Sequence, residues 1–116
     1  MENKITIEVL AAYLQERYGG RANEQSLFMK LVEEMGEVAE ILNKRAGRKE
    51  NAGEDLTHEL GVELCDMIHY VVAIAAINSI DLNQLILEKD RIASVKYGHT
   101  TNLETFLQDW EENVPE

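Results

Sequence analysis

The hydrophobic and polar positions along the chain repeat at helical spacing and predict four main helices. Apolar residues one turn apart mark segments at about 7–18, 56–79 and 82–97, and a further segment that begins near 23–26 and ends at about 44. Thr6 and Asp81 precede two of these segments as capping residues, and Gly19 and Gly98 follow two of them as stop signals. Because no segment alternates with the period of a strand, the pattern predicts an all-α fold.

The second segment carries two neighbouring lines of residues at helical spacing. One line is apolar and is expected to face the core, and the other places carboxylates along its border. The apolar line consists of Leu27, Leu31, Met35, Val38 and Leu42, and the bordering line of Lys30, Glu34, Glu37 and Ile41.

The connections between these segments favour an antiparallel helical bundle, with its core at about 26–97. A tail at 98–116 contains a short last helix, for which Thr101 and Glu104 form a capping signature. The stretch at 45–55 holds two glycines and mixed charges, so we expect an exposed loop; its basic residues folding over a ligand is the alternative. A chain of 116 residues is expected to form a single domain spanning 1–116.

The third segment is apolar on all sides between Met67 and Ile77, where only His69 and Tyr70 carry polar atoms. Such a helix is buried on all sides, and one layer of helices in so short a chain cannot cover it. We therefore predict that a second copy covers part of it, in a homodimer or a dimer of dimers. The run at 71–77 is much shorter than the ~20 residues of a membrane span, so no membrane segment is expected.

The charge balance restricts the partners of the chain. With 11 basic and 22 acidic residues the net charge is −11, which disfavours binding to a nucleic-acid polymer. A small polyanion that arrives with its own divalent cation stays compatible with this charge. The single cysteine, Cys65, is expected to be a small buried residue, and without a disulfide or a signal-peptide pattern we predict a cytoplasmic protein.

Two acidic motifs carry the candidate chemistry. The first runs from Glu33 through Glu34 to Glu37, and the second places Glu63 and Asp66 three residues apart. Residues at this spacing lie on one face of a helix, so two packed helices can bring four carboxylates together. These would repel one another unless a cation neutralised them, and hard oxygen ligands suit Mg²⁺ or Mn²⁺.

A simpler interpretation of the same acids is that they are solvated flanks of amphipathic helices. The chain would then be a non-catalytic helical module for dimerisation or protein interaction. His69 lies three residues after Asp66, but the second helix offers no matching histidine for a di-iron site. We therefore expect His69 to be a packed or interfacial residue.

The order EExxE followed by ExxD, with a Lys and a Tyr at the end of the fourth helix, resembles the MazG-like all-α nucleoside triphosphate pyrophosphohydrolases. The resemblance spans about 27–97, and 63–76 is similar in pattern to the dCTP pyrophosphatase branch. It implies hydrolysis of nucleoside or deoxynucleoside triphosphates to the monophosphate and pyrophosphate. Phosphoribosyl-ATP pyrophosphohydrolase, which shares the fold and the acidic motifs in outline, is a further alternative.

The resemblance also implies roles for individual residues. Glu33 would orient or deprotonate water, and Tyr70 would contact the substrate. Lys30, which shares a line with Glu34 and Glu37, is predicted to bind substrate too. The implied Mg²⁺ ligands are Glu34, Glu37, Glu63 and Asp66, and the implied phosphate-binding lysines are Lys89 and Lys96.

Three positions depart from the family pattern. Ala93 replaces an asparagine that is frequent in relatives, Gly98 replaces a proline, and Ile77 replaces an arginine of the dCTP branch. The metal-binding half of the site therefore follows the pattern more closely than the substrate-binding half.

Overall fold

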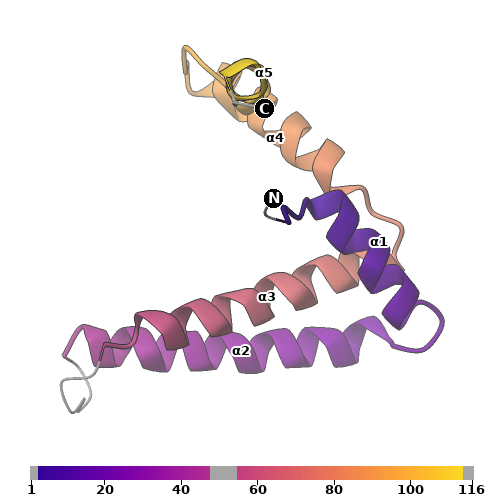
Figure 1. Cartoon of the computed structure of the whole chain (residues 1–116), viewed down its shortest axis with the longest axis vertical. Helices are drawn as coiled ribbons and strands as arrows, with labels where there is room; N and C mark the ends of the chain where they lie inside the picture. Colours follow the sequence, from indigo (N-terminus) through magenta and orange to yellow (C-terminus); the bar gives the residue numbers. More distant parts are fainter. Residues whose placement is uncertain (1–2, 48–54, 114–116) are drawn as a thin grey trace. The chain divides into compact units, whose positions relative to one another are not determined.

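The computed structural model describes residues 3–47 and 55–113, and the regular elements within these ranges are all helices (Figure 1). The all-α prediction is thus confirmed. The elements are α1 (Ile7–Tyr18), α2 (Glu24–Arg45), α3 (Thr57–Ile77), α4 (Leu82–Lys96) and α5 (Leu103–Asn113).

Short polar side chains fix where three of the helices begin. The backbone N–H of Val9 donates to Thr6 Oγ1 at 3.1 Å, and that of Gln84 donates to Asp81 Oδ1 at 3.0 Å. Asn23 caps α2 in the same way, accepting from the Ser26 N–H at 2.8 Å. Each cap satisfies a backbone donor that the first helical turn leaves without a partner. The two predicted caps, Thr6 and Asp81, are therefore confirmed.

Other helix ends differ from the prediction by small shifts. Asn102, and not Thr101, caps α5, because its Oδ1 accepts from the Thr105 N–H at 2.9 Å. The third helix ends at Ile77 and not at Ser79, whose φ of 55° is incompatible with a right-handed helix. Arg45 still belongs to α2, and positions 48–54 of the predicted loop lie outside the described residues.

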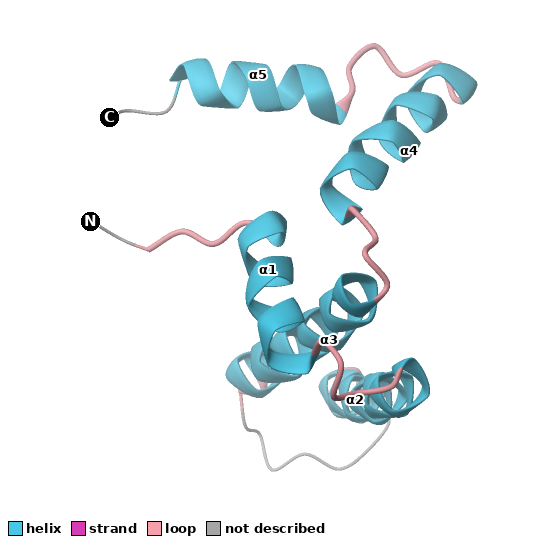
Figure 2. Cartoon of the chain, turned by 90° about the vertical axis from the view of Figure 1, so that its right-hand side faces the viewer, coloured by secondary structure: helices cyan, strands magenta, loops and turns pink. Residues whose placement is uncertain are grey.

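The chain divides into two compact units, Met1–Ile80 and Asp81–Glu116. In the first, α2 and α3 lie side by side as an antiparallel hairpin, and α1 packs on α3 (Figures 1 and 2). Its core joins leucines from the other segments to small residues of α3, which allow helices to approach closely. The buried apolar residues are Leu14, Leu27, Leu56, Val72, Ala73, Ala75 and Ala76.

The second unit consists of α4 and α5. The backbone N–H of Leu103, at the start of α5, donates to Asp90 Oδ2 of α4 at 2.6 Å. This bond and the Asn102 cap determine where α5 begins. The single domain over 1–116 stays a prediction.

The inward face of α2 differs in register from the predicted apolar line. Leu27 is buried, and Leu31 and Val38 are half-buried, as expected. Met35 and Leu42 are instead 49% and 47% exposed. The half-buried Glu34 occupies the inward position between Leu31 and Val38, so a carboxylate lies within the packed face and not on its border.

The prediction that α3 is buried on all sides holds only for its last turns. Val72, Ala73, Ala75 and Ala76 are buried, whereas Leu64, Ile68 and Val71 are exposed in the single chain. The prediction of a buried Cys65 was wrong, because Cys65 lies on this exposed side. Cysteine is often buried, but the residue type alone does not show which side of α3 the other helices cover.

By length and composition alone, α3 is apolar enough to cross a membrane, with a mean hydropathy of 1.8 over 18 residues. Core helices of soluble proteins share this property, and 22% of that segment is buried within the chain. The absence of a membrane segment stays a prediction.

Candidate metal centre

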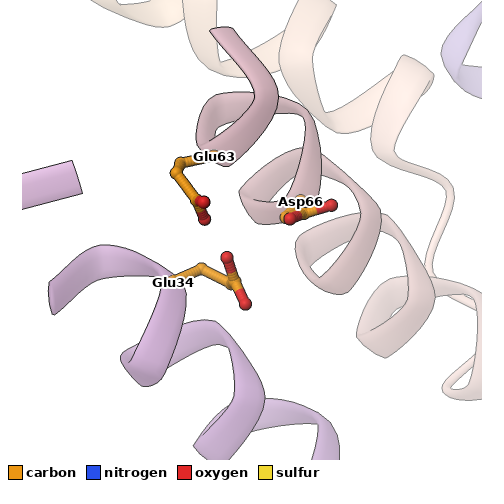
Figure 3. Close-up of side chains that lie close together, drawn as sticks. All are labelled: Glu34, Glu63 and Asp66. Atoms are coloured by element: carbon orange, nitrogen blue, oxygen red, sulfur yellow. The ribbon is translucent and has the colours of Figure 1, made fainter. Parts of the chain in front are cut away.

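Three carboxylates meet between α2 and α3. Glu34 comes from α2, and Glu63 and Asp66 come from α3, with the three side chains directed toward one another (Figure 3). One oxygen of each lies within 4.8 Å of the other two, and all three residues are half-buried. Within 3–47 and 55–113, no other group of three potential metal ligands is this close.

The local sequence explains this convergence. Glu63 and Asp66 are three residues apart, so they project from the same side of α3, toward α2. Glu34 takes an inward position in the apolar repeat of α2. Pairing of the two helices as a hairpin therefore brings the carboxylates together with no contribution from a loop.

The electrostatics of Glu63 are unusual. Its hydrogen bond with the Glu34 carboxyl group, its partial burial, and the negative charges of Glu37, Glu34 and Asp66 raise its pKa to about 7. Its Oε2 atom is buried and has no hydrogen-bond partner, the one such side-chain atom within the described ranges. A buried acceptor without a partner is unfavourable, so the site favours a proton or a cation.

A divalent cation fits this donor set. It would offset the repulsion among three acids and give the buried oxygen a ligand bond. Carboxylate oxygens without nitrogen or sulfur donors suit Mg²⁺ or Mn²⁺. The structure thus brings together three of the four predicted ligands, and one of their oxygens, Glu63 Oε2, is buried without a hydrogen-bond partner, whose place a cation would take.

The fourth predicted ligand, Glu37, lies outside the group of three. It is exposed on α2, one turn after Glu34. Its negative charge nevertheless raises the pKa of Glu63, which places it within electrostatic range of the cluster. Glu37 is therefore adjacent to the candidate centre without being part of its closest set.

Glu33 and Lys30 form an ion pair on the exposed side of α2. Lys30 Nζ lies 3.5 Å from Glu33 Oε2, and the two side chains are 59% and 61% exposed. Glu33 is not among the three clustered carboxylates. The predicted water-handling residue is thus paired with a predicted substrate-binding residue.

Tyr70 lies one turn after Asp66 and is half-buried. Burial raises its pKa, as do the nearby Tyr18 and the charges of Glu34 and Asp66, while the positive charge of Lys30 lowers it. Tyr70 therefore lies within electrostatic range of the acids and of Lys30, and its contact with the substrate stays a prediction.

His69 and Tyr18 form a contact that the sequence did not reveal. The Tyr18 hydroxyl oxygen and His69 Nε2 are hydrogen-bonded at 2.8 Å, and the His69 ring also lies edge-on to Tyr70. His69, predicted to be a packed or interfacial residue, thus packs against residues of its own chain. Nothing in the sequence pairs Tyr18 with a residue 51 positions away.

The two remaining predicted residues, Lys89 and Lys96, lie on α4. Their separation of seven residues places them on one side of that helix. Lys96 Nζ also lies 5.3 Å from the centre of the Tyr97 ring. Both belong to the second unit, and their contact with phosphates stays a prediction.

The fold and the cluster define an all-α protein with three carboxylates gathered between two helices. Residues 22–90 match the model of the MazG nucleotide pyrophosphohydrolase domain. This match covers more than half of the chain, so the chain belongs to the MazG family. In the same comparisons, no curated protein and no solved structure matches the chain.

Proposed function

We propose that the protein is a Mg²⁺-dependent nucleoside triphosphate pyrophosphohydrolase. It converts nucleoside or deoxynucleoside triphosphates to the monophosphate and pyrophosphate, and removes unwanted nucleotides from the cytoplasmic pool. The observation that carries this proposal is the meeting of Glu34, Glu63 and Asp66, with one buried oxygen left unpaired, in a chain of this family.

The metal half of the site consists of these three carboxylates, with Glu37 next to them. Mg²⁺ bound there supplies charge neutralisation for the phosphates and acidifies water. Transfer of a phosphoryl group needs positioning and electrostatic stabilisation much more than covalent participation of the protein. The carboxylates of α2 and α3, loaded with Mg²⁺, would supply this electrostatic stabilisation.

The other residues divide the remaining tasks. Glu33 orients the attacking water or accepts its proton, which requires the carboxylate to be ionised. Its carboxylate lies 3.5 Å from Lys30 Nζ, a second residue proposed to act on the substrate. Lys30, Tyr70, Lys89 and Lys96 contact the substrate, and the lysines take the charge of the departing pyrophosphate.

We further propose that the protein works as a homodimer. An exposed apolar line runs along α2 at alternating spacings of four and three residues. It consists of Phe28, Val32, Met35, Ala39 and Leu42. That spacing is typical of helices that pack against a partner helix. A second copy would cover this apolar line together with Leu64, Ile68 and Val71 of α3.

A triphosphate panel tests the activity. The purified chain is incubated with the common and several oxidised or deaminated triphosphates, with Mg²⁺ or with a chelator. Pyrophosphate and orthophosphate are measured separately. We expect Mg²⁺-dependent pyrophosphate from at least one substrate, whereas Mg²⁺ binding without hydrolysis would favour the non-catalytic helical module.

A further inference from the structure

Three rings form a continuous row from α1 to the residue beside the acids. The Tyr18 and His69 ring centres are 5.6 Å apart at an angle of 85°, and those of His69 and Tyr70 are 5.0 Å apart at 77°. Both contacts are edge-to-face, the arrangement that aromatic rings favour. The hydrogen bond between Tyr18 and His69 connects two helices and is partly buried.

We propose that Tyr18 and His69 are positioning residues that hold Tyr70 in place for the nucleotide. Residues 22–90 match the family model, so α1 lies outside the matched segment. The inference therefore makes α1 part of the functional site and adds two residues to it. It rests on the proposed function, in which Tyr70 contacts the substrate.

The geometry explains how the restraint works. A terminal bond to an aromatic or imidazole ring has a broad torsional preference, so neighbouring contacts decide the ring's orientation. The Tyr18 hydroxyl fixes one nitrogen of the His69 ring, and the His69 ring then limits the positions open to Tyr70. Tyr70 therefore cannot change its ring orientation without disturbing its edge-to-face contact with His69.

The position of Tyr18 at the end of α1 contributes to the restraint. The Gly19 N–H donates to the Gln15 carbonyl at 2.7 Å and closes the last turn of the helix. Leu14, one turn before Tyr18, is fully buried and anchors the same helix. The hydroxyl is thus held by a packed element, which favours a fixed hydrogen bond over a transient one.

The test compares Tyr18→Phe with Tyr13→Phe. Both remove one phenolic hydroxyl from α1, but Tyr13 is 56% exposed and takes no part in the row. One net hydrogen bond corresponds to about 2- to 12-fold in an equilibrium constant. We expect Tyr18→Phe to raise KM about 3- to 10-fold, with kcat within about twofold of wild type, and Tyr13→Phe to change neither.

Two readouts do not depend on turnover. Calorimetry with a non-hydrolysable α,β-methylene triphosphate and Mg²⁺ should show the same 3- to 10-fold weakening in Tyr18→Phe, with unchanged Mg²⁺ affinity in the absence of nucleotide. The ¹⁵N shift of His69 Nε2 should move in Tyr18→Phe and stay constant in Tyr13→Phe. His69→Phe should also raise KM. Combining it with Tyr18→Phe should raise KM little further, because both substitutions remove the same hydrogen bond.

The outcomes separate this inference from the proposed function. If the wild type releases no pyrophosphate from any triphosphate, the proposed function fails. If the wild type is active and Tyr70→Phe raises KM while Tyr18→Phe matches Tyr13→Phe, the positioning inference alone is overturned. A lower melting temperature in Tyr18→Phe with unchanged KM and analogue binding would also overturn it, because the row would then serve stability only.

Discussion

One carboxylate oxygen of Glu34 on α2 and one of Glu63 on α3 lie within 4.8 Å of each other across the helical hairpin. Two ionised carboxylates this close repel each other, which favours a proton on one of them. Hydrogen bonding with the Glu34 carboxyl group is the largest cause of the raised pKa of Glu63, which reaches about 7. The same two groups would have to lose that proton to bind a cation, so metal binding and protonation compete at one position.

This competition predicts how stability varies with pH. The pKa of Glu63 rises from 4.5 to about 7 on folding, so between these values the folded state binds more protons than the unfolded state. Stability from this group is complete below about pH 4.5 and is lost as the pH rises to about 7. Without Mg²⁺, the melting temperature should therefore fall across this window in a manner specific to Glu63.

Glu63→Gln provides the comparison, because glutamine imitates the neutral carboxyl group. At pH 8 without Mg²⁺, this variant should melt at a higher temperature than wild type, and near pH 4.5 the difference should vanish. Saturating Mg²⁺ should raise the melting temperature of wild type only. If the melting temperatures of wild type and Glu63→Gln changed in parallel with pH, the raised pKa of Glu63 would be contradicted.

Removing a clustered carboxylate should strongly weaken Mg²⁺ binding. Outer-shell partners of metal ligands contribute about 10- to 100-fold in affinity, so losing a ligand should cost at least about 100-fold. Asp66→Asn should therefore weaken Mg²⁺ binding and pyrophosphate release together, as measured by calorimetry and product assay. Glu88→Gln on α4 is the charge-matched control and should leave both unchanged.

Glu33 should separate chemistry from metal binding. As a water-handling residue, it should contribute about 10²- to 10⁴-fold to kcat. Glu33→Gln should thus lower kcat strongly and leave Mg²⁺ affinity unaltered. Loss of Mg²⁺ affinity in this variant would instead make Glu33 a ligand.

Lys30→Met removes the partner of Glu33. Because exposed ion pairs contribute only about 0.2–1 kcal/mol, the melting temperature should barely change. KM should rise, since a positive charge next to Tyr70 is lost. An unchanged KM would exclude Lys30 from substrate binding.

The proposed homodimer predicts a position-dependent effect of introducing charge. Val32→Glu and Ile68→Glu should shift the protein toward the monomer in analytical ultracentrifugation, because each places a charge within a buried apolar contact. Val9→Glu is the control, since Val9 is an exposed apolar residue of α1 outside both lines. A wild-type protein that stays monomeric at high concentration would contradict this proposal.

The sequence predicted the class of elements and the acidic centre more accurately than the side of each helix that is covered. Helical spacing and short polar caps are local properties, so α1 to α4 and the caps Thr6 and Asp81 could be derived. Whether Met35 or Glu34 faces inward depends on the rotation of α2 against α3. Helical spacing is the same for the line through Met35 and for the line through Glu34, one position away. The sequence pattern therefore did not show which of the two lines faces α3.

Contacts between distant segments were also beyond the pattern. The hydrogen bond between Tyr18 and His69 connects two residues that no spacing rule in the sequence pairs. The exposure of Cys65 was missed for a related reason, because the residue type indicates burial but not which side of α3 is covered. The predicted carboxylates, by contrast, met because their spacing within each helix already placed them on one side.

The central claim is that the carboxylate cluster, loaded with Mg²⁺, hydrolyses the bond between the α- and β-phosphates. The most direct measurement is ³¹P NMR of a triphosphate substrate from the panel, incubated with wild type or with Asp66→Asn. With Mg²⁺, wild type should produce equal amounts of monophosphate and pyrophosphate, and Asp66→Asn or chelated wild type should leave the triphosphate intact. Orthophosphate with a nucleoside diphosphate, or equal rates in wild type and Asp66→Asn, would contradict the claim.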